Sequence, residues 1–247
     1  MTTEQSLETG HMLTAERLRV RVGSTNILES VSMTLCRGDF VALSGVNGSG
    51  KSTLLRFLAG AGKGGSNPKP DAGKVLFNGT SVYEDLSNRQ RRQLLRDVFA
   101  FLPQKAKENM LPRETFRYNM LLPFVIAKKP ISQSRVDELV AAYGVGDLVS
   151  KPVGSLSGGE QQLVALMGLE LIPEKEVFLL DEPFAALDSE RSDMVSERLR
   201  RLAESGRLVV MISHRDDEPL ATRKIVLKRG AIVSDSEGPG SYSETSH

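Results

Sequence analysis

The sequence has one cysteine, no tryptophan and no long apolar run. Cys36 is the only cysteine among 247 residues, so a disulfide within the chain is excluded and a reducing compartment is expected. No apolar run approaches the roughly 18 residues of a membrane span, and the start lacks the basic-then-apolar order of a secretory leader. The formal charge of +1 gives no reason to expect a nucleic-acid partner. We therefore expect a cytosolic protein that reaches a membrane only through partners.

The length and the apolar pattern indicate one large α/β domain, with or without a subdomain. Hydrophobic residues make up 40% of the chain and charged residues 26%, which is ordinary for a globular protein. Continuous apolar runs at 40–44, 177–180 and 208–212 predict buried parallel strands. Alternating stretches within 12–38 predict antiparallel strands, and Cys36 is expected to be packed there as a core thiol.

The region from Lys105 to Ser155 has a different character. Pro112, Pro123 and Pro130 interrupt it. Apolar residues at helical spacing predict one amphipathic helix over 134–143. We expect a mainly helical region here.

A glycine-rich loop between a predicted strand and a predicted helix is the most specific motif. It reads Gly45-Val46-Asn47-Gly48-Ser49-Gly50-Lys51-Ser52-Thr53 and fits the phosphate-binding pattern G-x-x-x-x-G-K-[ST]. Glycines allow the backbone N–H groups to approach phosphates closely, and the helix start adds positive charge. Lys51 is expected to reach the β- and γ-phosphates, and the Ser52 hydroxyl to bind Mg²⁺. The flanking strand and helix argue against a chance glycine-rich turn.

Two acidic residues follow the apolar run at 177–180. Asp181 is a candidate ligand of Mg²⁺, directly or through water, and Glu182 is a candidate base that orients or deprotonates the attacking water. Ligand sites in open parallel sheets lie at the carboxyl ends of the strands, where this pair is predicted. Taken alone, such a pair is as often two solvated acids that simply end a strand as it is a catalytic pair. The phosphate-binding loop upstream favours the catalytic interpretation.

Further motifs resemble the ATP-binding cassette (ABC) ATPases, the nucleotide-binding subunits of ABC transporters. Leu156–Gln162 (LSGGEQQ) resembles the family's signature, and Phe101–Gln104 its glutamine loop. Ala185–Asp188 is similar to its aspartate loop, and Ile212–His214 to the segment with its switch histidine. Each short motif is weak alone, but all of them follow the family's order between residues 13 and 234.

The resemblance implies a P-loop NTPase core with a mostly parallel sheet, an N-terminal antiparallel β subdomain and an inserted α-helical subdomain. It implies a single ABC ATPase domain over 12–247. In that division 12–104 and 157–234 form the nucleotide-binding core, and 105–156 forms the helical subdomain. The segments 1–11 and 235–247 are expected to be flexible tails.

The resemblance also implies roles for individual residues. Gln104 is expected to contact Mg²⁺ or water and to sense the membrane partner, and His214 to contact the γ-phosphate. The residues of the signature are expected to bind a nucleotide held by a second subunit: Ser157, Gly158, Gly159 and Glu160. A lone histidine is usually structural, but His214 follows an apolar strand at its polar end, which favours the functional interpretation.

The expected protein is an ATP-hydrolysing subunit of an ABC transporter that uses ATP and Mg²⁺. It would form a head-to-tail dimer, either a homodimer or a heterodimer with a second ABC ATPase subunit, and drive integral membrane permease subunits. Its expected place is the inner face of the cell membrane. The resemblance implies a groove in the helical region that receives the permease, with four candidate lining residues: Leu111, Phe116, Tyr118 and Met120. The alternative, which apolar residues of this kind favour, is that most of the four belong to the core.

The sequence departs from the family pattern at a few positions. The aromatic residue that usually stacks on adenine in the family falls near Val22, which has no ring. Stacking contributes about 1–3 kcal/mol per base in nucleic-acid binders, so weaker nucleotide affinity or altered base choice is expected. Leu163, Gly168 and Arg215 also replace usual residues, and these changes bear on subunit contacts rather than on hydrolysis.

Two alternatives remain at the sequence level. A soluble ABC ATPase of DNA repair, translation or assembly would need a coiled-coil insertion or a second cassette, and this sequence has one phosphate-binding loop. A scaffold that binds ATP without hydrolysing it would lack Glu182 or His214, and both are present.

Overall fold

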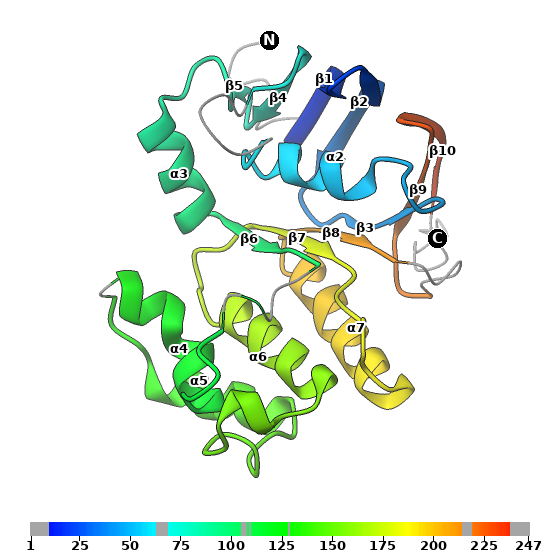
Figure 1. Ribbon diagram of the computed structural model, residues 1–247. Helices are drawn as coiled ribbons and strands as arrows, with labels where there is room; N and C mark the ends of the chain where they lie inside the picture. The colour runs from blue at the N-terminus through cyan, green and yellow to red at the C-terminus, as the bar shows by residue number, and fades with distance from the viewer. Residues whose placement is uncertain are drawn as a thin grey trace, which may run out of the picture.

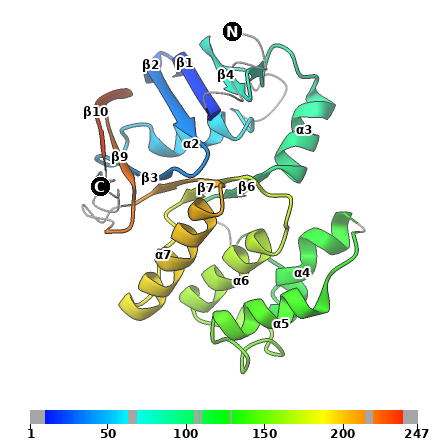
Figure 2. The same cartoon turned by 180° about the vertical axis from the view of Figure 1, so that it is seen from behind.

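The computed structural model describes residues 10–62, 69–104, 108, 110–127, 129–213 and 219–237. Two sheets and a group of helices form three layers (Figure 1). An antiparallel sheet with β1 and β2 lies on one side of a central, mostly parallel sheet, and helices α4 to α7 lie on the other side (Figure 2). This architecture confirms the predicted fold class.

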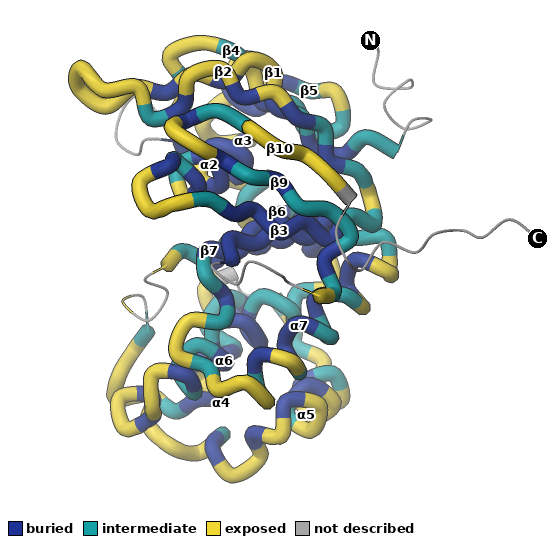
Figure 3. The backbone as a smooth tube through the Cα atoms, turned by 90° about the vertical axis from the view of Figure 1, so that its right-hand side faces the viewer, coloured by how far each residue is buried: buried dark blue, intermediate teal, exposed yellow. Residues whose placement is uncertain are grey.

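The central sheet has six strands in the order β10-β9-β3-β8-β7-β6. Its bounds are β3 (Phe40–Ser44), β6 (Phe99–Leu102), β7 (Val177–Asp181), β8 (Leu208–Ile212), β9 (Arg223–Lys228) and β10 (Ala231–Glu237). Neighbouring strands run parallel except for β10, which pairs antiparallel with β9. Every residue of β3, β7 and β8 is buried, because both faces of the sheet are covered (Figure 3).

The second sheet has four antiparallel strands in the order β2-β1-β4-β5. They are β1 (His11–Val22), β2 (Thr25–Cys36), β4 (Ala72–Phe77) and β5 (Thr80–Ser81). The antiparallel strands predicted from 12–38 are confirmed. Cys36, at the end of β2, is only partly buried, so the expected core position is wrong. Burial and the nearby Asp39 raise the pKa of its thiol, which keeps it protonated at neutral pH.

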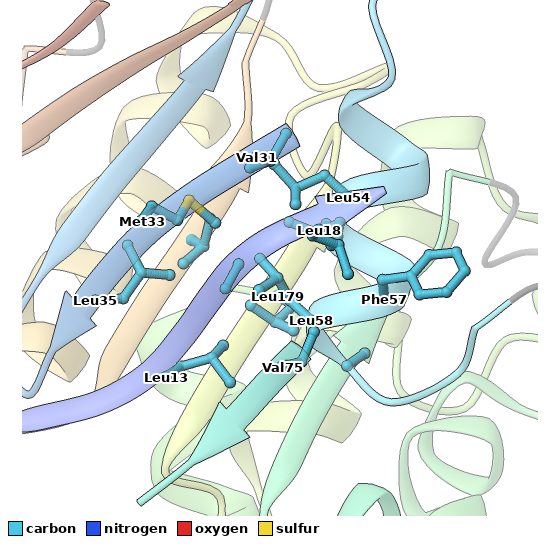
Figure 4. Packing of buried hydrophobic residues seen from close by; sticks show 14 of the residues in the cluster. Leu13, Leu18, Val31, Met33, Leu35, Leu54, Phe57, Leu58, Val75 and Leu179 are labelled. Atoms are coloured by element: carbon cyan, nitrogen blue, oxygen red, sulfur yellow. The ribbon is translucent and has the colours of Figure 1, made fainter. Parts of the chain in front are cut away.

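Helix α2 (Lys51–Leu58) lies between the two sheets and closes the first core. Leu54 and Leu58 point from α2 into a cluster with Leu18 from β1 and Leu179 from β7 (Figure 4). Burying each such leucine contributes about 1.5–3 kcal/mol relative to exposure. The core therefore fixes helix α2, which follows the glycine-rich loop, against β7.

The helices on the other face build a second core. They are α4 (Phe116–Ala127), α5 (Gln133–Ala142), α6 (Gly158–Glu170) and α7 (Ser189–Glu204), while α3 (Asn88–Asp97) precedes β6. Phe178 and Leu180 of β7 join this core, whereas Leu179 faces the first core. Because side chains alternate along a strand, β7 contributes to both cores and lies between them.

Helix α4 corrects one sequence-based expectation and decides between two interpretations of another. Pro123 lies inside the helix instead of interrupting it. Its missing N–H costs a helix hydrogen bond, but Phe116, Met120 and Phe124 are buried in the second core, and that packing holds the helix together. Phe116 and Met120 are therefore core residues and not groove residues, whereas Leu111 and Tyr118 are exposed as a groove requires.

A polar network joins α5, α6 and α7. The guanidinium of Arg198 on α7 forms a partly buried ion pair with Glu170 at the end of α6. The hydroxyl of Tyr143 donates to Oε2 of Glu170 at 2.9 Å, and the Arg198 guanidinium lies 4.7 Å from the centre of the Tyr143 ring. Burial raises the pKa of Tyr143, so its hydroxyl stays a donor. The network ties the helical region to the α7 side of the core.

The first and last strands of the structure end slightly differently from the predicted limits of the two tails. β1 begins at His11, and β10 continues to Glu237, three residues into the segment expected to be a tail. Pairing with β9 explains the extension, because Asp235, Ser236 and Glu237 all have partners there. The division into a core and a helical subdomain stays a prediction.

Candidate active site

The glycine-rich loop leaves β3 at Ser44 and enters α2 at Lys51. Gly45 has φ of +138°, and a Cβ there would lie 2.1 Å from the Leu227 carbonyl oxygen on β9. Gly50 has φ of +102°, and its Cβ would lie 2.7 Å from the Ile27 carbonyl oxygen on β2. A side chain is excluded at both positions by neighbouring backbone as well as by conformation. The loop shape therefore depends on both sheets.

A pocket of about 550 Å³ opens over this loop. It is lined by Ile27, Asn47, Gly48, Gly50, Lys51, Ser52, Thr53, Gln104 and Glu182. The lining joins the start of α2 to residues just beyond the ends of β6 and β7. The first turn of α2 presents backbone N–H groups and the positive end of the helix dipole, which suits phosphate oxygens.

Lys51 is folded back onto its own loop. Its Nζ donates to the Gly45 carbonyl at 2.6 Å and to the Val46 carbonyl at 3.1 Å. Burial lowers the pKa of Lys51, while the carboxylates of Glu182 and Asp181 raise it. The two carbonyls thus hold the ammonium group at the loop.

Glu182 and Gln104 come together because their strands are neighbours. β6 and β7 are parallel, with Leu102 opposite Leu180, so the residues that follow them emerge at the same sheet edge. Nε2 of Gln104 donates to Oε1 of Glu182 at 3.2 Å. Two residues distant in sequence therefore meet in one pocket.

The backbone at Glu182 is strained. Its φ is +54°, and Ala186, four residues on, has φ of +66°. Left-handed conformations of this kind cost about 1–3 kcal/mol each for residues other than glycine. They persist only where the surroundings hold them, and they gather at functional sites.

The three predicted magnesium ligands offer oxygen atoms. Ser52 carries a hydroxyl, Asp181 a carboxylate that is 5% exposed, and Gln104 an amide carbonyl. Hard oxygen donors fit Mg²⁺, which is usually bound by one or two protein groups together with phosphates and water. Across the described residues, no cluster of three or more His, Cys, Asp or Glu side chains forms a ready-made metal cage. The donor set therefore fits a metal that arrives with a nucleotide.

The signature residues lie at the start of α6, outside this pocket. Ser157 caps the helix: its hydroxyl accepts from the Glu160 N–H at 3.3 Å, and the Glu160 carboxylate accepts from the Ser157 N–H at 2.8 Å. Hydrogen bonds to the Glu160 carboxylate from the backbone N–H of Ser157 and from its side chain lower the pKa of Glu160. A Cβ at Gly159 would lie 2.5 Å from the Ala186 carbonyl oxygen. The start of α6 thus packs directly against the turn after Glu182.

His214 lies outside the described residues. The strand before it, β8, ends at Ile212 with that residue opposite Asp181 on β7. Ser213 is buried, and its N–H donates to the Leu43 carbonyl at 3.3 Å.

A second pocket of about 440 Å³ adjoins the phosphate-binding loop, and Thr53 lines both. Its lining residues are Val20, Arg21, Val22, Gly23, Thr53, Arg56, Phe57 and Gly62. Val22 is 61% exposed, whereas the one aromatic ring in this lining, that of Phe57, is buried. The pocket therefore offers aliphatic and guanidinium surface without an exposed aromatic ring.

Two residues at the site had no individual role predicted from the sequence. Ile27 lines the phosphate pocket from β2. Gln162 of α6 contacts the turn after Glu182, with its Nε2 3.2 Å from the Pro183 carbonyl oxygen. Neither residue type carries a signal of its own, because both positions depend on how distant segments pack.

Comparisons with known proteins show which family this chain resembles. A family model described as "ABC transporter" matches residues 28–185. The "Macrolide export ATP-binding/permease protein MacB" of Aggregatibacter actinomycetemcomitans is 36% identical over 215 residues, which cover 86% of this chain and 32% of that protein. This chain thus spans about a third of the length of that relative.

Two further matches extend over nearly the whole of the matched protein. The "Lipoprotein-releasing system ATP-binding protein LolD" of Aquifex aeolicus is 32% identical over 232 residues, covering 91% of this chain and 97% of that one. The solved dimeric ATP-binding cassette MJ0796, bound to ADP and Pi, aligns with a TM-score of 0.79 and 26% identity. That alignment covers 92% of this chain and 98% of the solved one.

Proposed function

The chain belongs to the ABC transporter family of ATP-binding cassettes, and from this premise we propose that it is the ATP-hydrolysing subunit of an ABC transporter. It is an ABC ATPase that binds and hydrolyses ATP. The observation that carries the proposed site is the pocket in which Lys51, Gln104 and Glu182 converge over the glycine-rich loop. The triphosphate would lie there against the backbone N–H groups at the start of α2.

In this proposal the residues of the pocket act mainly by position and charge. Lys51 exchanges its two loop carbonyls for the β- and γ-phosphate oxygens. Glu182 accepts a proton from the attacking water, and Gln104 orients the Glu182 carboxylate through the hydrogen bond between them. Magnesium, held by Ser52, Asp181 and Gln104, would neutralise charge on the phosphates. His214 would contact the γ-phosphate.

A second subunit would complete the site. Ser157, Gly158, Gly159 and Glu160 lie outside the phosphate pocket of their own chain. A head-to-tail dimer would bring the start of α6 from one subunit to the nucleotide of the other, with two-fold symmetry. The matched cassette MJ0796 is itself described as dimeric, which supports this arrangement. A homodimer and a heterodimer with a second ABC ATPase both satisfy it.

Membrane permease subunits are the proposed partners, at the inner face of the cell membrane. None of the helices in the described part of the chain combines the length and the apolarity needed to cross a bilayer. MacB carries "ATP-binding/permease" in its name, and LolD is named as the ATP-binding protein of a releasing system. These transporter names disfavour the soluble alternative in DNA repair, translation or assembly.

The surface proposed for the permease lies beside α4. An apolar pocket of about 250 Å³ lies between α3, β6, α4 and α6, with Phe101, Pro123 and Phe124 among its lining residues. On α4 itself, Tyr118, Val125 and Ile126 are exposed large side chains. Exposed apolar groups beside a groove are typical of a protein-binding surface.

The substitution Ile126→Glu tests this surface. Ile126 is 74% exposed, so we expect the folded protein and its ATP affinity to remain intact. A charge at an apolar interface leaves an unpaired buried carboxylate, so co-purification of a multi-span protein from detergent-solubilised membranes should fall about ten-fold or more. The control is Glu190→Gln on the distant helix α7, which should retain the membrane partner. Equal recovery with both variants would contradict the proposed surface, and recovery of ribosomes or nucleic acid would support the soluble alternative.

The substitution Val22→Tyr tests where the base lies. A ring at this exposed position can stack on adenine, and stacking contributes about 1–3 kcal/mol per base, so the Kd for ATP should fall about five- to hundred-fold. Titration with a fluorescent ATP analogue measures the change. Val22→Leu, which adds apolar surface without a ring, is the control and should leave Kd within about two-fold, since it adds one methylene at a site that stays exposed. Equal ATP affinities of the tyrosine and leucine variants would show that the adenine base binds elsewhere.

A further inference from the structure

We propose that Gln162 is a positioning residue for hydrolysis, which fixes the backbone of the turn that carries Glu182. The inference rests on the proposed function, because it takes Glu182 as the group that activates water. Gln162 lies in the second turn of α6. Its Nε2 donates to the Pro183 carbonyl at 3.2 Å and, more weakly, to the Glu182 carbonyl at 3.5 Å.

Glu182 is thereby held from two sides by two glutamines. Gln104 donates to its carboxylate, and Gln162 donates to its carbonyl. The same carbonyl also accepts from the Ala185 N–H at 3.1 Å, which closes the turn. The left-handed φ of Glu182 needs such support, because a residue with a side chain otherwise relaxes to a negative φ. Relaxation would redirect the carboxylate away from the phosphate pocket.

The other end of the turn also rests on α6. Ala186 has a left-handed φ, and its carbonyl oxygen lies so close to Gly159 that a Cβ there would be 2.5 Å away. The two strained residues of the turn thus face the first and second turns of one helix, the helix that begins with the signature segment. Movement at the start of α6 is therefore passed to Glu182 of the same chain through Gly159 and Gln162. When the nucleotide held by a second subunit contacts the start of α6, the contact would therefore change the position of the catalytic carboxylate of Glu182 in the first subunit.

Two substitutions at Gln162 separate the effect of its hydrogen bonds on turnover from the effect of its packing. Gln162→Leu removes the donor, and Gln162→Glu keeps the size but turns a carboxylate toward two carbonyl oxygens. Misplacement of a catalytic group by about 1 Å costs up to about 100-fold, so we expect kcat of both variants to fall about ten- to hundred-fold. KM for ATP should stay within about two-fold, since Gln162 does not line the phosphate pocket. Near-normal kcat in Gln162→Glu would mean that only packing matters and would overturn the inference.

Arg135 on α5 provides a matched control at the other end of α6. Its guanidinium also donates to two backbone carbonyls, those of Glu170 and Leu171, each at 3.1 Å. Arg135→Leu therefore removes the same number of hydrogen bonds to backbone carbonyls without touching the turn after Glu182 or the signature segment. We expect its melting temperature to drop as in Gln162→Leu while kcat stays within about two-fold. Equal losses of kcat in both would indicate general loosening of α6 and overturn the inference.

A double-mutant cycle with Glu182→Gln tests whether Gln162 acts through Glu182. If it does, adding Gln162→Leu to Glu182→Gln should lower the remaining turnover by less than about two-fold. A full additional loss would show that Gln162 acts elsewhere. Normal turnover of Glu182→Gln alone would instead refute the proposed base. A slow Glu182→Gln with normal Gln162 variants would refute only the present inference. If Gln162→Leu does not fold, Gln162→Glu serves in the same cycle.

Discussion

Lys51→Ala should abolish nucleotide binding. Lys51 is buried in the loop, and its ammonium group lines the pocket, where it would contact the β- and γ-phosphates. Hydrogen bonds to charged groups contribute about 1.5–3 kcal/mol each, so losing two of them should weaken binding about 100-fold or more. Titration with a fluorescent ATP analogue measures the loss.

The control for Lys51→Ala must separate lost affinity from lost folding. In the free protein Lys51 satisfies the Gly45 and Val46 carbonyls, so alanine also removes two internal hydrogen bonds. Lys51→Met keeps the apolar stem and should bind nucleotide as poorly as the alanine variant. In the wild type, saturating ATP should raise the melting temperature, and in both variants this rise should vanish. Retained affinity in a folded variant would argue against the loop as the phosphate site.

The elements that place the site could be predicted because local sequence determines them. The apolar runs of β3, β7 and β8 are continuous, as strands covered on both faces must be, and each ends in polar residues. Parallel pairing then brings those ends to one edge, with Leu102 opposite Leu180 and Asp181 opposite Ile212. That register suffices to bring Gln104 and Glu182 into one pocket with the glycine-rich loop.

Other features were beyond prediction because tertiary packing decides them. Pro123 disfavours a helix locally, yet α4 continues through it because its apolar side chains are buried against α6. The left-handed φ of Glu182 leaves no trace in residue type, since glutamate gives no conformational signal of the kind that glycine gives. The same holds for Gln162, whose contact depends on where α6 meets the turn.

Glu182→Gln should keep nucleotide binding and slow turnover by about 10²–10⁴-fold, the range typical of lost general-base catalysis. The substitution preserves size and shape. The amide oxygen can still accept the hydrogen bond that Gln104 donates, so the pocket geometry should persist. The amide cannot take a proton from water, so the chemical step loses its base. Phosphate release under saturating ATP measures kcat, and the fluorescent ATP analogue measures binding separately.

Glu176→Gln is the matched control at the opposite end of the same strand. Glu176 precedes β7 and pairs with Arg37 at 2.9 Å on the surface, where both side chains are 41% exposed. An exposed ion pair of this kind contributes at most about 1 kcal/mol, so this variant should fold and turn over like the wild type. If only Glu182→Gln loses turnover and its ATP affinity is unchanged, the substitution has removed stabilisation of the transition state and not ground-state binding of ATP. Unchanged turnover in Glu182→Gln would place the base at another residue, because no amide can substitute for a carboxylate in proton transfer.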